Sequence, residues 1–321
     1  MNVALHIRKA FHNKCDCKIY DWNKVKPGGN ILFLGTVLRQ TLRYLKKLLD
    51  KSRIVFYGTT EGHSFMDEES LQVAKEIKIV AVSNFVKQML EEVGISVAGV
   101  VHHGLDMEDR RIDMRFAKFL EKKFKNKRII FTASANHSRK GLDKLLYCYR
   151  LVEKEKEDAY LILHSEPTGY YDVTKIARSL GLKRVWLTNL FGRLSIGKLN
   201  SFYHQCSFYV QPSFSEGFGL PLLEAFRFDK PVIAVDASPF NEVIKQRETG
   251  LLLPLNKITW FNFENQVLFK MHIYRAEDLA DAILELMSNQ QHLTRMQENI
   301  RREKGNWSIR GLYPKLLDYF T

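Results

Sequence analysis

The stretch that most constrains this chain runs from Ser213 to Phe226 and reads SFSEGFGLPLLEAF. Its glycines allow a loop backbone to approach a ligand closely, and Pro221 suits the first position of a helix. The unpaired N–H groups of that first helical turn would attract an anion. Because a carboxylate repels phosphate, Glu216 and Glu224 are expected to face the hydroxyl groups of a ligand. The alternative is an ordinary strand–loop–helix junction with a capped helix.

The spacing of the two carboxylates within EGFGLPLLE resembles the signature of family-4 glycosyltransferases of the GT-B fold. This resemblance implies that Glu216 contacts the donor sugar and that Glu224 binds the ribose of a nucleotide-sugar. It also implies a transfer that retains the anomeric configuration. The positions between the two carboxylates would complete the donor-binding turn: Gly217, Phe218, Gly219 and Leu220.

A second loop, SANHSRKG, lies between a predicted strand at 128–133 and a predicted helix at 142–155. At such a helix start, basic side chains, backbone N–H groups and the helix dipole converge on a phosphate. In the family a Lys-Gly pair at this place holds the donor pyrophosphate, and Lys140 and Gly141 match it. Arg139 would supply a second cation, and Ser134 stands where the family usually has an arginine. The alternative is a solvated Arg-Lys pair.

The family resemblance assigns two further positions. The loop after the predicted strand at 185–187 lies against the nucleotide base in the family, which here means about 189–194 and includes Phe191. A histidine of the first domain lies near the reacting carbon in this family. His63, in YGTTEGHSF, is the candidate catalytic residue, and His102 is a second candidate. The alternative for His63 is a histidine on a surface loop.

Strands and helices alternate in both halves of the chain, which predicts an α/β protein with two Rossmann-like domains facing across a cleft. The first predicted strand is Val3–Ile7. The resemblance implies that the acceptor lies on the first domain, the donor on the second, and that the C-terminal helix returns to the first domain. The predicted division is 1–107 for the acceptor side, 108–127 for a charged linker, 128–304 for the donor side and 305–321 for the crossover helix.

The formal charge of +13 favours phosphates, anionic lipid or nucleic acid as partners. Nucleic acid is less favoured, because basic and stacking aromatic residues do not interleave clearly. Arg39, Arg43, Lys46 and Lys47 share one face of a predicted helix, which is either a solvated face or a surface that docks on an anionic membrane. Four cysteines without a disulfide framework fit a reducing cytoplasm, and the opening residues have too short an apolar run for a signal peptide.

An Asp-x-Asp motif is absent from the sequence, so we expect no metal and no cofactor in the reaction. Lys140, Arg139 and the helix start would instead stabilise the charge that develops on the leaving diphosphate. The expected substrates are a nucleotide-diphosphate sugar and a glycan, glycolipid or protein acceptor. The rival interpretations are a non-catalytic sugar or nucleotide binder and a DNA-directed transferase. The aromatic segment at 256–273 is expected to be a hairpin on its own domain or an exposed apolar patch.

Overall fold

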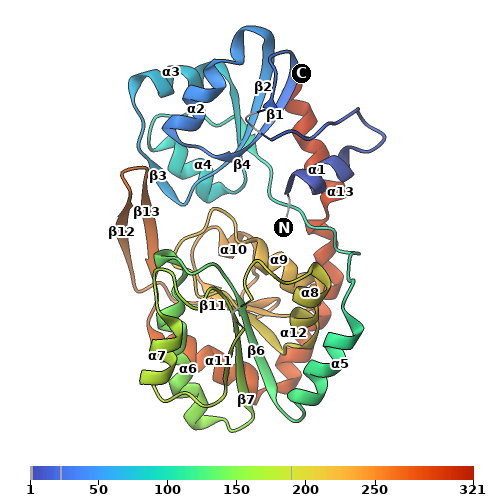
Figure 1. Cartoon of the computed structure of the whole chain (residues 1–321), viewed down its shortest axis with the longest axis vertical. Coiled ribbons are helices and arrows are strands. Elements are labelled where there is room, and N and C mark those ends of the chain that lie inside the picture. The colour runs from blue at the N-terminus through green and yellow to red at the C-terminus, as the bar shows by residue number, and fades with distance from the viewer. Residues whose placement is uncertain (1–2, 22–23, 189) are drawn as a thin grey trace.

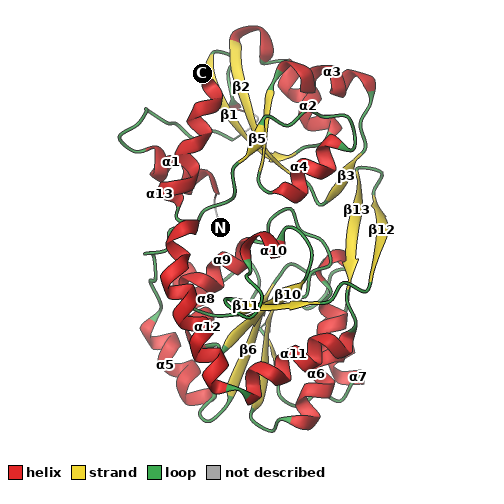
Figure 2. Ribbon diagram, turned by 180° about the vertical axis from the view of Figure 1, so that it is seen from behind, coloured by secondary structure: helices red, strands yellow, loops and turns green. Residues whose placement is uncertain are grey.

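The computed structural model describes residues 3–21, 24–188 and 190–321 of the chain. Two parallel sheets form the cores of two domains, one above the other in Figure 1, and helices flank each sheet. This arrangement confirms the predicted α/β fold with two Rossmann-like domains. In both views the carboxyl ends of the parallel strands, where folds of this kind bind their ligands, face the junction between the two domains (Figures 1 and 2).

The sheet of the first domain has the order β1-β2-β4-β5. Its strands are β1 (Gly29–Thr36), β2 (Ser52–Thr59), β4 (Lys78–Ala81) and β5 (Gly99–Val100). The segment predicted as the strand Val3–Ile7 is instead part of helix α1, and that prediction was wrong. The physical reason is the spacing of Ile7, Ala10 and Phe11, which buries one helical face. The remaining helices of this domain are α2 (Arg39–Lys46), the 3-10 turn η2 (Leu49–Lys51), α3 (Glu68–Glu76) and α4 (Asn84–Glu91), after α1 (Val3–Phe11).

The basic face of α2 lies against α3 and is paired with its acidic N-terminal turn. Arg43 contacts Asp67 at 2.5 Å and Glu69 at 3.2 Å. Arg39 lies 3.8 Å from Asp67, and Lys46 lies 2.9 Å from Glu69. Three of the four cations predicted to share a face are therefore engaged with a neighbouring helix.

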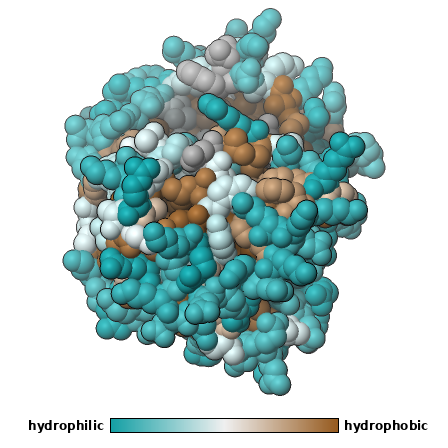
Figure 3. Space-filling view, turned by 60° about the horizontal axis from the view of Figure 1, so that its bottom comes forward, coloured by the Kyte–Doolittle hydropathy of each residue, from teal (hydrophilic) through white to brown (hydrophobic). Residues whose placement is uncertain are grey.

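The second domain contains a six-stranded parallel sheet in the order β11-β10-β9-β6-β7-β8. Its first helix, α5, belongs to the predicted linker segment and packs against α8. The strands are β6 (Arg128–Ala133), β7 (Ala159–His164), β8 (Val185–Leu187), β9 (Phe208–Val210), β10 (Val232–Val235) and β11 (Gly250–Leu253). The helices are α5 (Met114–Lys123), the 3-10 turn η3 (Ser138–Lys140), α6 (Leu142–Glu155), α7 (Val173–Ser179), α8 (Ile196–Gln205), α9 (Leu220–Arg227), α10 (Phe240–Val243), α11 (Ala276–Ser288) and α12 (Gln290–Glu303). Viewed from this end of the molecule, the surface is mostly hydrophilic, with apolar side chains gathered toward its middle (Figure 3).

The C-terminal segment returns to the first domain, as predicted. It consists of the 3-10 turn η4 (Lys304–Trp307), α13 (Ile309–Leu312) and the 3-10 helix η5 (Tyr313–Phe320). The last of these packs against α1 and β2, and the hydroxyl of Tyr313 donates to the carbonyl of Gly104 at 3.0 Å. Asp229 holds the base of this crossover, because its carboxylate contacts Lys304 at 2.5 Å and Arg110 at 3.1 Å.

The aromatic segment forms a hairpin of β12 (Lys257–Phe263) and β13 (Val267–Ile273). The sequence analysis expected a hairpin that packs on its own domain, but this hairpin also contacts the first domain. Strand β13 pairs antiparallel with β3 (Gly62–Ser64) of the first domain, which gives a third sheet in the order β12-β13-β3. Figures 1 and 2 both show this sheet bridging the two domains along one side. Among the described residues, no helix has the length and apolarity needed to cross a bilayer.

Candidate functional site

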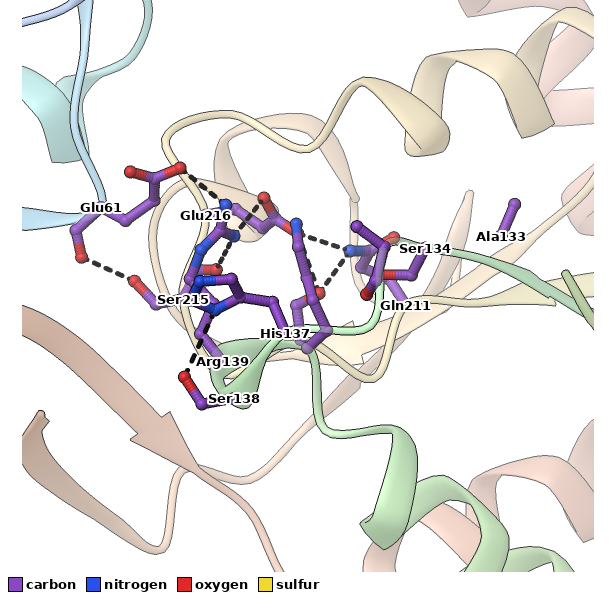
Figure 4. Close-up of polar contacts among 12 residues, drawn as sticks. Glu61, Ala133, Ser134, His137, Ser138, Arg139, Gln211, Ser215 and Glu216 are labelled. Carbon is purple, nitrogen blue, oxygen red and sulfur yellow. Dashed lines mark hydrogen bonds and ion pairs between the residues drawn. The ribbon is translucent and has the colours of Figure 1, made fainter. Parts of the chain in front are cut away.

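Glu216 is the centre of a buried ionic cluster in the loop that joins β9 to α9. Its carboxylate is 2.5 Å from Nζ of Lys140 and 3.0 Å from Nη1 of Arg139. Two neighbours in its own loop add hydrogen bonds to Oε1: the hydroxyl of Ser213 at 2.8 Å and Nε2 of Gln211 at 3.0 Å. Figure 4 shows Arg139 and Gln211 beside the carboxylate of Glu216. The residue is 7% exposed, so a single acid is held by two cations and two neutral donors away from solvent.

A left-handed turn at Gly141 places the two cations opposite that carboxylate. The backbone has φ +61° at this glycine, a conformation that side chains rarely adopt. A Cβ atom built there would lie 2.3 Å from the carbonyl oxygen of Pro212. Glycine therefore lets the loop after β6 lie directly on the loop after β9. This packing brings Arg139 and Lys140, the cations assigned to the diphosphate, into direct contact with Glu216, a contact that the sequence analysis did not predict.

The electrostatics of the cluster keep Glu216 ionised. Burial alone would raise the pKa of its carboxyl, but the charges of Lys140 and Arg139 outweigh burial and lower the pKa to about 2. The pKa of Arg139 is raised: burial lowers it, but the carboxylates of Glu216 and Glu61 outweigh that effect. The site therefore holds fixed charges of both signs in a region of low water content, where they act strongly on a bound ligand.

Glu216→Gln should change how folding stability depends on pH. A carboxyl whose pKa falls from 4.5 to about 2 on folding contributes stability above about pH 4.5, and this is lost as the pH falls toward 2. At pH 7 the variant should lose roughly 3–5 kcal/mol, because two buried cations lose a partner. We expect the difference from wild type to narrow at pH 3, measured by urea unfolding. Glu298→Gln, at an exposed position on α12, is the control; a difference independent of pH would contradict the assignment.

The first domain contributes a residue that the sequence analysis missed. Glu61, in the turn between β2 and β3, places Oε1 2.8 Å from Nη2 of Arg139 (Figure 4). Its carbonyl oxygen accepts a hydrogen bond from the hydroxyl of Ser215 at 2.7 Å. A signal was present, since Glu61 follows a strand end two residues before His63.

Glycine allows this close approach of the two domains. A Cβ atom at Gly217 would lie 2.0 Å from the side-chain hydroxyl of Thr59. The carbonyl oxygen of Gly217 accepts a hydrogen bond from the hydroxyl of Ser83 at 2.6 Å. Residues 211–219 are all buried, so the first domain covers the loop that the sequence assigned to donor binding.

The structure does not bring the predicted catalytic histidines into the cluster. His63 lies on β3 between the buried residues Gly62 and Ser64, and so its side chain points to the other face of the sheet. There Nε2 is 2.5 Å from Glu92, and its ring packs on Trp260 at 4.6 Å between centroids. These contacts place the His63 side chain outside the ionic cluster, and its catalytic role stays a prediction.

The second candidate histidine, His102, belongs to a different contact between the domains. Its Nε2 is 2.7 Å from Glu242. The same carboxylate accepts hydrogen bonds from the backbone N–H groups of Asn84 at 2.9 Å and Phe85 at 3.1 Å. Glu242 thus caps the first turn of α4 from the opposite domain, and His102 takes part in that capping.

The remaining predicted donor residues separate into several places. Phe218 is 3% exposed and packs on His102, His103 and Trp307, so it fills the junction between domains. Leu220 is half-buried at the start of α9, after Gly219, whose φ is +92°. Ser134 directly follows β6 and donates its hydroxyl hydrogen to the carbonyl of Ala135 at 3.2 Å.

The residues assigned to the ribose and the base follow β9 and β8, two strands that β6 and β7 separate in the sheet. Glu224 is in the second turn of α9 and accepts a hydrogen bond from the hydroxyl of Tyr203 at 2.7 Å. Phe191 packs against the ring of His164, which ends β7, at 5.3 Å between centroids. Asn189, the first residue of the predicted base loop, lies outside the described residues. Ligands of doubly wound sheets bind beyond the carboxyl ends of the strands, and these groups lie there.

Comparison with known proteins gives a family match for most of the second domain. Residues 113–262 match the family model described as glycosyl transferases group 1. A relative from Sulfolobus islandicus rod-shaped virus 1, named uncharacterized glycosyltransferase 335, is 25% identical over 272 residues, which are 82% of this chain and 79% of the relative.

Solved glycosyltransferases share the fold. The structure of a glycosyltransferase from Rickettsia africae aligns with a TM-score of 0.66 at 20% identity, over 88% of this chain and 79% of the other. Anabaena HepE, solved in complex with UDP and glucose, aligns with a TM-score of 0.70 at 15% identity, over 89% of this chain and 77% of HepE. The chain therefore has the GT-B fold of glycosyltransferases, and its residues 113–262 match glycosyl transferases group 1.

Proposed function

We propose that this protein transfers a sugar from a nucleotide-diphosphate sugar to an acceptor, with retention of the anomeric configuration. The observation that carries the proposal is the ionic cluster, in which Arg139 and Lys140 precede α6 and meet Glu216 of the EGFGLPLLE segment. The match to glycosyl transferases group 1 covers these three residues. The fold supplies a second domain at the same junction, where an acceptor would approach.

In the proposed reaction, the bond between the anomeric carbon and the diphosphate oxygen breaks while the oxygen of an acceptor hydroxyl bonds to that carbon. The proton of that hydroxyl passes to the leaving diphosphate oxygen. Negative charge develops on the leaving diphosphate. Lys140, Arg139 and the N–H groups at the start of α6 would stabilise this charge. Glu216 would hold the sugar hydroxyls, and Glu224 the ribose. Because protein cations can serve the leaving group, we propose a reaction that needs no added metal.

The acceptor is proposed to be a glycan, glycolipid or protein. An anionic membrane surface is less favoured, because Arg39, Arg43 and Lys46 are paired with the acidic start of α3. A uridine diphosphate sugar is the first donor to test, since HepE was solved with UDP and glucose.

The test is a panel of nucleotide-sugars, first for thermal stabilisation and then for release of nucleoside diphosphate with and without an acceptor mixture. We expect one donor class to stabilise the protein and to be consumed, and EDTA to leave the activity intact. Donor binding without turnover would favour the non-catalytic binder. Loss of activity in EDTA with recovery in Mn²⁺ would contradict the metal-free reaction.

A further inference from the structure

The ionic cluster is electrically balanced before any donor is bound. Its cations are Arg139 and Lys140, and its carboxylates are Glu216 and Glu61. All four side chains are mostly buried, with exposed fractions from 9% for Glu216 to 19% for Glu61. The two charges that the proposed function assigns to a diphosphate are thus already neutralised by the protein.

The two carboxylates are held very differently. Glu216 accepts hydrogen bonds from four side chains, all in its own domain. Within the described residues, the carboxylate of Glu61 bonds Arg139 alone. Glu61 also comes from the opposite domain, so it can leave the cluster without unfolding the loop after β9.

The backbone around Glu61 is nevertheless fixed. Its carbonyl oxygen accepts hydrogen bonds from Ser215 at 2.7 Å and from the N–H of Lys270 at 3.1 Å. The next residue, Gly62, packs so closely on β13 that a Cβ atom would lie 2.0 Å from the carbonyl oxygen of Leu268. The turn is therefore constructed to present this carboxylate to Arg139 (Figure 4).

A diphosphate entering this cluster would meet two carboxylates with only two cations to share. Uncompensated charge in a buried site costs several kcal/mol. The arrangement becomes favourable only when one carboxylate withdraws, and the one with a single contact is Glu61. We propose that Glu61 is a positioning residue that holds Arg139 in the donor-free protein and is exchanged for the donor diphosphate. This inference rests on the proposed function.

The exchange couples donor binding to the contact between domains. While Glu61 bonds Arg139, the first domain covers the loop after β9. A donor that displaces Glu61 releases this part of the cover, and its apparent affinity is reduced by the population in which Arg139 is already engaged.

The test compares wild type with Glu61→Gln, which keeps the size of the side chain and removes its charge. Glu92→Gln is the matched control, because Glu92 is also a first-domain carboxylate but contacts His63. UDP and inorganic pyrophosphate are the probes, titrated by calorimetry at fixed pH and salt. We expect Glu61→Gln to bind UDP and pyrophosphate about tenfold more tightly than wild type. A tenfold change in Kd corresponds to about 1.4 kcal/mol. The control should bind like wild type.

Equal or weaker binding by a folded Glu61→Gln variant, with wild type still binding, would overturn the exchange and leave the proposed function standing. Tighter pyrophosphate binding by Glu61→Gln, together with no turnover of any nucleotide-sugar by wild type, would support the exchange but contradict the proposed transferase activity. If neither wild type nor Glu61→Gln binds UDP or pyrophosphate, both the exchange and the proposed function are contradicted. Glu61→Ala serves as the second variant if the glutamine form does not fold, with the same expected direction.

Discussion

Lys140→Ala is expected to lower sugar-transfer turnover by about 100- to 1,000-fold, the typical effect of removing one preorganised group that stabilises developing charge. Lys140 is 14% exposed in its side chain and lies beside Glu216 in the turn before α6. In the proposed reaction its cation would stabilise the leaving diphosphate. The measurement is release of nucleoside diphosphate at saturating donor, with donor affinity determined separately.

The fold should survive this substitution, because Arg139 still pairs with Glu216 at 3.0 Å. Lys154→Ala, at an exposed position in the last turn of α6, removes the same charge at the far end of the helix that follows Lys140 and should leave turnover unchanged. Lys140→Arg should recover part of the activity, since it restores charge with a different shape. Turnover by Lys140→Ala that equals wild type would exclude Lys140 from the reaction.

The parts of the site that the sequence predicts are those encoded within one short segment. Gly141 and Lys140 are neighbours in the chain, and a glycine turn before a helix defines their geometry locally. The relative positions of Glu216 and Glu224 are also set locally, because only a short loop and the start of α9 lie between them. The predicted parallel strands follow from apolar runs between helices, a pattern that is also local.

The features that the sequence did not predict depend on contacts between distant segments. Glu61 reaches Arg139 across 78 positions of chain, and only the packing of two domains makes them neighbours. The pairing of β13 with β3 joins residues that are still farther apart in the chain, and register between strands of different domains has no local signal. The placement of His63 also depends on tertiary contacts, because its position on β3 directs its side chain to Glu92 and Trp260. At Val3–Phe11 a short apolar run fits either period, and packing selected the helix.

The sheet between domains makes the position of Glu61 depend on a glycine. Strand β3 pairs with β13 through the register Gly62 to Phe269, His63 to Leu268 and Ser64 to Val267. Two flanking hydrogen bonds extend it: Phe65 N–H to Gln266 at 2.9 Å and Lys270 N–H to Glu61 at 3.1 Å. The hairpin therefore acts as a structural connection that sets where the first domain meets the ionic cluster.

Gly62→Ala is expected to break this connection, lowering the free energy of unfolding by about 2–3 kcal/mol, a large effect for one added methyl group. The new Cβ would lie 2.0 Å from the carbonyl oxygen and 2.8 Å from the carbonyl carbon of Leu268. Backbone atoms in a paired strand cannot rotate away as a side chain does, so the strands must separate. Gly311→Ala is the matched control, because no atom lies within 4 Å of its added Cβ.

Hydrogen exchange gives the most direct measurement of this change. Amides of 62–65 and 267–270 should lose protection in Gly62→Ala, whereas those of β6 and β9 should keep it, because the core of the second domain does not include the hairpin pairing. Glu61 would then no longer be fixed beside Arg139, so pyrophosphate should bind more tightly, as in Glu61→Gln. Protection and affinity equal to those of wild type would show that the hairpin can move without separating from β3. In that case the charge exchange at Arg139 would proceed inside a sheet that stays paired, and Glu61 alone would move.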